Sequence, residues 1–277
     1  MAEMPIWEVV LYVDGPVTVR RRVITTQQKG FRVDDPFYSD IEILGIPSGI
    51  KATVTARAQD HTVAYKAAVF FFGHMVDALT LAINRPMYLS LTERERSNRQ
   101  RHDVKRVVER EEFESAFCEA HQLAQGSPSF LRSLGWYRKG LTSEDPLDRF
   151  LAFWNSIEIV AGKYSRYVPT INTQRAKNGS ISQVWECFKA LWGPCDKWPV
   201  IPGQDKWVDQ SYAIRVGVAH GSEPIDIHKV TEVSERLQAI EEVAYHFLAG
   251  WRAQFLGLDR QPPSESLPTE ERVLLPE

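Results

Sequence analysis

The stretch VTEVSERLQAIEEVAYHFLAGW, residues 230–251, indicates most clearly how this chain folds. Its apolar side chains recur at intervals of three and four residues, at Val230, Val233, Leu237, Ile240, Ala244, Phe247 and Trp251. Charged residues such as Glu235, Arg236 and Glu242 fall outside this stripe. An apolar stripe with this spacing is typical of a helix that packs into a bundle. We therefore expect a long bundle helix here.

Upstream segments share this helical periodicity. The expected helices span residues 113–135 (as one helix or a pair), 148–162, 182–192 and 205–219. Gly162 is the expected C-cap of the second of these, and Gly193-Pro194 is expected to end the third. The sequence thus predicts an all-α bundle of four to five helices over residues 113–258.

The first part of the chain has a different period. Predicted strands span residues 6–13, 17–26, 40–46 and 50–58, separated by turn signals such as Asp14-Gly15-Pro16. From Val63 to Ile83 the apolar residues return to helical spacing, and Pro86 follows as a helix terminator. We expect residues 1–90 to form a small antiparallel sheet with this helix docked on it. The whole chain is then an α+β protein.

Residues 91–112 are almost entirely polar and are expected to form a solvated helix or a linker. A sharper hypothesis is that its basic side chains follow a phosphate backbone; these are Arg94, Arg96, Arg99, Arg101, Lys105 and Arg106. Interleaved acidic residues such as Glu95 and Asp103 weaken that hypothesis. The tail over 259–277 is rich in Pro and Glu and is expected to be disordered.

Composition excludes several classes of protein. The net charge of −3 over 277 residues is unlike that of a nucleic-acid coat protein. The three cysteines have no CxxC spacing, which argues against a zinc ribbon or a disulfide framework and fits a reducing compartment. His74 and Asp77 interrupt the longest apolar run and lack a third metal ligand by spacing. We expect a cytoplasmic protein with no membrane span, metal or cofactor.

The candidate site is Arg215 and His220, which fall at the end of the helix expected over 205–219. On an ideal helix, side chains five positions apart point about 140° away from each other. The two groups would then converge only at a distorted helix end or across a dimer axis. Gly221 follows as a possible left-handed cap, and the helix dipole favours a protonated imidazole in the last turn.

Residues 214–221, IRVGVAHG, resemble the Arg-x4–6-His signature of the HEPN superfamily. Residues 148–158, DRFLAFWNSIE, are similar to the second helix of those bundles. A weaker resemblance over the full chain is to methylamine-utilisation J-type proteins. The HEPN resemblance implies a small helical bundle that pairs as a homodimer and acts on RNA without a metal. It also implies a place in toxin–antitoxin or phage-defence systems, with an antitoxin or other regulatory protein as a possible partner.

The same resemblance implies roles for the two residues. His220 would serve as general acid or base on the 2′-oxygen or the leaving 5′-oxygen of RNA. Arg215 would hold the phosphate. The products would be a 2′,3′-cyclic phosphate and a 5′-hydroxyl.

An alternative from another class remains open, namely a non-catalytic nucleotide-binding or dimeric assembly module. Arg215 would then form a structural ion pair with Glu158 or Glu186. Val216 favours this alternative, because active members commonly carry a polar residue at that position.

Overall fold

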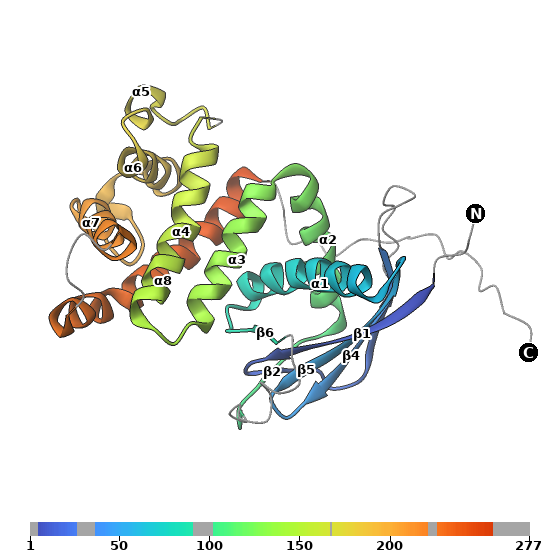
Figure 1. Cartoon of the computed structure of the whole chain (residues 1–277). Helices are drawn as coiled ribbons and strands as arrows, with labels where there is room; N and C mark the ends of the chain where they lie inside the picture. The colour runs from blue at the N-terminus through green and yellow to red at the C-terminus, as the bar shows by residue number, and fades with distance from the viewer. Residues whose placement is uncertain (1–4, 27–36, 91–101, 167, 221–225, 257–277) are drawn as a thin grey trace, which may run out of the picture.

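The computed structural model describes residues 5–26, 37–90, 102–166, 168–220 and 226–256 (Figure 1). It confirms the α+β class, with an antiparallel sheet followed by a mainly helical region. The predicted tail over 259–277 and residues 91–101 of the charged segment lie outside the described residues.

The main sheet has the strand order β3-β4-β5-β1-β6, and every neighbouring pair is antiparallel. Its strands are β1 (Ile6–Asp14), β3 (Val23–Thr26), β4 (Phe37–Ile46), β5 (Gly49–Arg57) and β6 (Tyr88–Ser90). At Gly49 a Cβ atom would lie 2.1 Å from the carbonyl oxygen of Val13, and φ is +153°. Only glycine permits β1 and β5 to pair this closely at that point.

The strand predicted over residues 17–26 is wrong as a single element. It is divided into β2 (Val17–Thr18), which pairs in parallel with β7 (Arg106–Val107), and β3 at the edge of the main sheet. The chain bends at Arg20 and Arg21, and all of residues 20–22 are exposed. A continuous strand would point alternate arginines at the core, so the bend keeps all three charges in water. The short strands β6 and β7 were not predicted.

Helix α1 (His61–Ile83) lies on one face of the sheet, as predicted, and also packs against α2 (Arg110–Gly126) and α3 (Pro128–Thr142) (Figure 1). The Asp60 side chain accepts a hydrogen bond from the Val63 amide at its start, and Asn84 ends it in a left-handed conformation. By length and composition alone α1 could cross a membrane, but 61% of its most apolar window is buried inside the molecule. Its apolar surface is therefore core surface.

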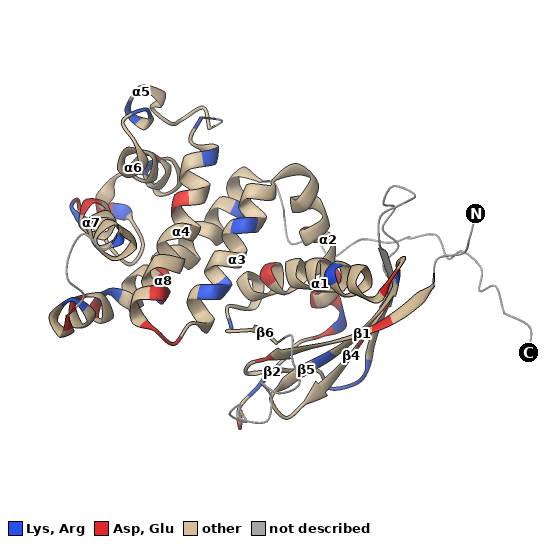
Figure 2. Cartoon of the chain, viewed as in Figure 1, with Lys and Arg blue, Asp and Glu red and all other residues tan. Residues whose placement is uncertain are grey.

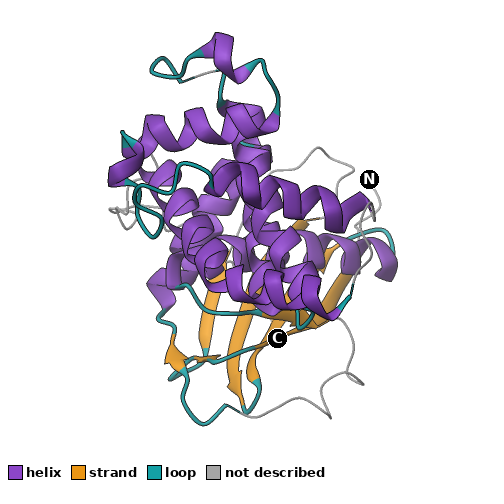
Figure 3. Ribbon diagram, turned by 90° about the vertical axis from the view of Figure 1, so that its left-hand side faces the viewer, coloured by secondary structure: helices purple, strands orange, loops and turns teal. Residues whose placement is uncertain are grey.

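The helices after α1 gather on one side of the sheet (Figure 3). Beyond α2 and α3 they are α4 (Pro146–Tyr164), α5 (Thr173–Ala176), α6 (Ser180–Trp192), α7 (Trp207–His220) and α8 (Ile227–Phe255). Within the described residues this region has six helices of 13 residues or more, whereas four to five were predicted. Residues 113–135 fall in two helices because Pro128 starts a new one. Gly162 lies inside α4 and is not its cap.

Most of the predicted stripe of α8 is confirmed as core. Val233, Ile240, Ala244, Phe247 and Trp251 are each 0% exposed, whereas Val230 and Leu237 are only half-buried. The buried side chains of the sheet and of the helices form one continuous cluster, so no break in the core follows the domain boundary expected near residue 112.

Two buried ion pairs also join helices that are distant in sequence. Arg138 of α3 donates to Asp77 of α1 at 2.5 Å, and Arg252 of α8 pairs with Glu119 of α2. They hold α1 and α2 to the rest of the bundle.

Candidate functional site

Helix α7 buries its apolar face, and this orientation leaves Arg215 and His220 outside the buried face. Trp207, Val208, Ser211 and Ile214 are buried, and α7 packs against α4 and α6. Arg215 follows Ile214 on the flank of this face, where its side chain keeps 24% exposure. His220 is exposed at the end of the helix.

The structure brings Arg215 and His220 together within one chain. The Nη1 atom of Arg215 lies 3.3 Å from Nε2 of His220. The 140° spacing of an ideal helix does not keep the two groups apart, because the long guanidinium side chain spans the angular gap on the helix surface, and no second copy of the chain is needed for the contact. A guanidinium can only donate, so this contact is a hydrogen bond only in the tautomer whose Nε2 accepts. Gly221, the expected cap, lies outside the described residues.

Glu158 of α4 holds the same guanidinium. Its Oε2 atom lies 3.3 Å from Nη2 of Arg215, and its side chain is 18% exposed. The Tyr212 ring lies 5.9 Å from the guanidinium carbon, which is within cation–π range. Arg215 is thus oriented by a carboxylate and a ring from two helices, while one of its nitrogens faces the imidazole.

The ion pair with Glu158 is the one that the structural alternative required. The other partner considered, Glu186, is 2% exposed and lies 3.5 Å from Arg175 instead. Ion pair and imidazole contact coexist, so the geometry is compatible with both hypotheses. The Glu158 carboxylate also neutralises the positive charge of Arg215, so little net positive charge remains at this site.

The structure gives other roles to Lys105 and Arg106, the two candidate phosphate-binding residues of the charged segment that it describes. Lys105 donates to the carbonyl of Ile46 at 2.8 Å, and Arg106 forms two bonds of 2.5 and 2.6 Å to Glu112. These contacts fix β7 and the start of α2. The other four candidates, Arg94, Arg96, Arg99 and Arg101, lie outside the described residues.

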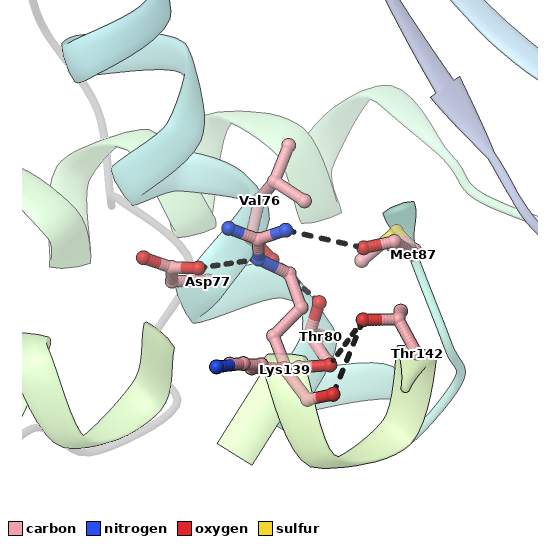
Figure 4. Close-up of polar contacts among 7 residues, drawn as sticks. Val76, Asp77, Thr80, Met87, Lys139 and Thr142 are labelled. Carbon is pink, nitrogen blue, oxygen red and sulfur yellow. Dashed lines mark hydrogen bonds and ion pairs between the residues drawn. The ribbon is translucent and has the colours of Figure 1, made fainter. Parts of the chain in front are cut away.

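Asp77 serves as an ion-pair partner in this fold. It accepts from Arg138, which also contacts the carbonyl of Met87 at 3.5 Å (Figure 4). Burial raises the pKa of Asp77, and the Arg138 charge opposes that shift. His74 packs its ring 4.1 Å from that of Phe70. Among the described residues, no group of three or more His, Cys, Asp or Glu side chains could hold a metal ion.

Two hollows lie away from Arg215 and His220. One, of about 550 Å³, is lined by the bend between β2 and β3 and includes Arg20–Arg22. The other, of about 340 Å³, lies where α4 ends beside α5 and α6. Its lining residues are Ser165, Arg166, Thr173, Ala176, Lys177 and Gln183. Sequence reasoning missed this second hollow, because its residues come from three segments and match no spacing motif.

Comparison of the chain with protein-family models, with curated proteins and with solved structures finds no match.

Proposed function

We propose that this chain is a metal-independent endoribonuclease of the HEPN type that acts in the cytoplasm as a homodimer. A toxin or phage-defence effector restrained by an antitoxin-like protein is the corresponding biological role. The observation that carries the proposal is the 3.3 Å contact between Arg215 and the exposed His220 at the end of α7. An imidazole that can take up or release a proton beside a permanent cation is suited to cleavage of a phosphodiester.

The proposed reaction uses the 2′-hydroxyl of RNA as its own nucleophile. Nε2 of His220 takes the proton of that hydroxyl, and the 2′-oxygen forms a bond to phosphorus. The bond from phosphorus to the 5′-oxygen breaks, and this oxygen leaves as a hydroxyl after taking a proton from water or from the imidazole of a second copy. Arg215 donates to the phosphate oxygens, where charge builds, through the nitrogen that faces the imidazole, while its Nη2 atom stays paired with Glu158.

A second candidate is a non-catalytic nucleotide-binding or dimeric assembly module. Glu158 already neutralises the charge of Arg215, and the next residue, Val216, has no polar side chain. In this case His220 is a helix-end residue and the ion pair joins α7 to α4.

The test incubates the purified protein with total RNA in EDTA and identifies the ends of any fragments. We expect 2′,3′-cyclic phosphate and 5′-hydroxyl ends, and we expect Arg215→Ala and His220→Ala each to abolish them. Arg132→Ala and His246→Ala, at exposed positions on α3 and α8, are the matched controls and should cleave normally. An unchanged rate in His220→Ala, with its fold verified by circular dichroism, would remove the assignment. Nucleotide binding or dimerisation without cleavage would favour the second candidate.

A further inference from the structure

The hollow formed by α4, α5 and α6 has a lining suited to an anion. Its polar side chains are two hydroxyls, an amide and two cations, and every one of them can donate a hydrogen bond. Among the described residues that line it, there is no carboxylate. Its volume of about 340 Å³ is at the lower end of the range for small-ligand sites. Figure 2 shows basic residues in blue on α5 and near the end of α4, around this region.

The two cations that line the hollow are not neutralised inside the protein. Arg166 and Lys177 are exposed, and neither has an ion-pair partner in the part of the chain that the structure describes. Arg175, between them in sequence, pairs with Glu186 at 3.5 Å. One basic residue of this region therefore stabilises the fold, while the two that line the hollow retain their charge for a ligand.

A buried hydroxyl points to the same conclusion. Ser165 is 0% exposed, and its Oγ atom has no hydrogen-bond partner among the described residues. A buried hydroxyl without a partner is unfavourable, because it has lost its hydrogen bonds to water. Ser165 also borders the hollow, and a rotation of its side chain toward the hollow would let Oγ donate to a bound anion. Thr173 and Gln183 provide further donors from α5 and α6.

The hollow and the Arg215 site both lie beside α4, because Ser165 at its end lines the hollow and Glu158 within it contacts Arg215. Ser165 comes seven residues after Glu158, which is two helical turns, so the two lie on nearly the same face about 10 Å apart along the axis. Helices α5, α6 and α7 follow one another along this side of α4 in Figure 1, and α6 contacts both α5 and α7. A short single strand could therefore reach from one site to the other.

We propose that this hollow is a phosphate-binding subsite, in which Arg166 and Lys177 hold one phosphate of an RNA strand while a nearby phosphate lies at Arg215 and His220. This inference rests on the proposed ribonuclease function for the identity of the strand. The chemistry that the hollow recognises is a phosphate group, which inorganic phosphate or a nucleoside monophosphate would also supply.

The first experiment measures binding of a short 2′-O-methyl oligoribonucleotide by fluorescence anisotropy, since this strand lacks the hydroxyl that cleavage needs. The double variant Arg166→Ala/Lys177→Ala should bind about tenfold more weakly than the wild type. The slope of log affinity against log salt should fall by about 1.4, because each cation on a single strand contributes about 0.7. Lys66→Ala/Arg132→Ala removes the same charge from exposed positions on α1 and α3 and should bind as the wild type does.

A second experiment titrates inorganic phosphate and a nucleoside monophosphate into the same variants by NMR. If Arg166→Ala/Lys177→Ala binds the oligonucleotide with the affinity and the salt slope of the wild type, the subsite proposal is overturned. This holds even if the protein cleaves RNA. Phosphate binding that depends on these two residues, in a protein that cleaves no RNA, supports the subsite and removes the ribonuclease proposal. Phosphate binding without oligonucleotide binding identifies a free phosphate compound as the ligand. Binding of neither overturns the subsite.

Discussion

The buried pair of Glu119 and Arg252 gives this protein a stability that depends on pH in an unusual direction. Burial raises the pKa of Glu119 from 4.5 to about 7, although Arg252 opposes the shift. The Glu119 side chain is only 6% exposed, so solvent screens this carboxylate little. Between these two pKa values the folded chain holds a proton that the unfolded chain has released. The contribution of this group is fully present below pH 4.5 and is lost as pH rises through 7.

The magnitude follows from the size of the shift. A change of about 2.5 pKa units, at 1.36 kcal/mol for each unit, corresponds to about 3 kcal/mol. At roughly 2–4 °C of melting temperature for each kcal/mol in a chain of this size, the effect amounts to roughly 6–12 °C. Glu119→Gln carries no titrating group at this position. Its stability relative to the wild type should therefore rise by this amount between pH 4.5 and pH 8.

The assay records thermal and urea unfolding of both proteins across this pH range. Comparing the two proteins cancels the contributions of all other titrating groups. Glu111→Gln, on the exposed side of the same helix, is the matched control for losing an acidic side chain. Parallel profiles for the wild type and Glu119→Gln would refute the assignment of a raised pKa to this carboxylate.

Two further predictions concern packing and thiol reactivity. Gly140→Ala should lower the free energy of unfolding by about 1–3 kcal/mol in urea titrations, because its Cβ would lie 2.6 Å from the buried Phe153 ring. Gly126→Ala meets nothing within 4 Å, and equal stability of the two variants would contradict the expectation. Burial, with Glu186 nearby, raises the pKa of the Cys187 thiol to about 12. A disulfide reagent at pH 8 should label exposed Cys118 in the native protein but Cys187 only after unfolding; native labelling of Cys187 would refute this.

The class of fold and most of the long elements could be predicted from the amino-acid sequence alone. The apolar residues recur over many positions in α8 and alternate along β5. Such a pattern places them on one face of the helix or strand, and that face packs against the core. The position of α1 was predicted for the same local reasons, from helical spacing over residues 63–83 and from Pro86 after it, and the helix ends at Asn84. These features are properties of single segments and need no knowledge of the neighbours.

Which side chains contact one another depends on how the segments pack together and could not be predicted from any one of them. The contact of Arg215 with His220 depends on a guanidinium long enough to cross the helix surface, and its orientation depends on Glu158 from another helix. The break at Arg20–Arg22, the pairing of β2 with β7 and the hollow beside Ser165 likewise depend on segments far apart in sequence. Periodicity reports which face of a segment is buried, whereas contacts between segments depend on packing that no single segment encodes.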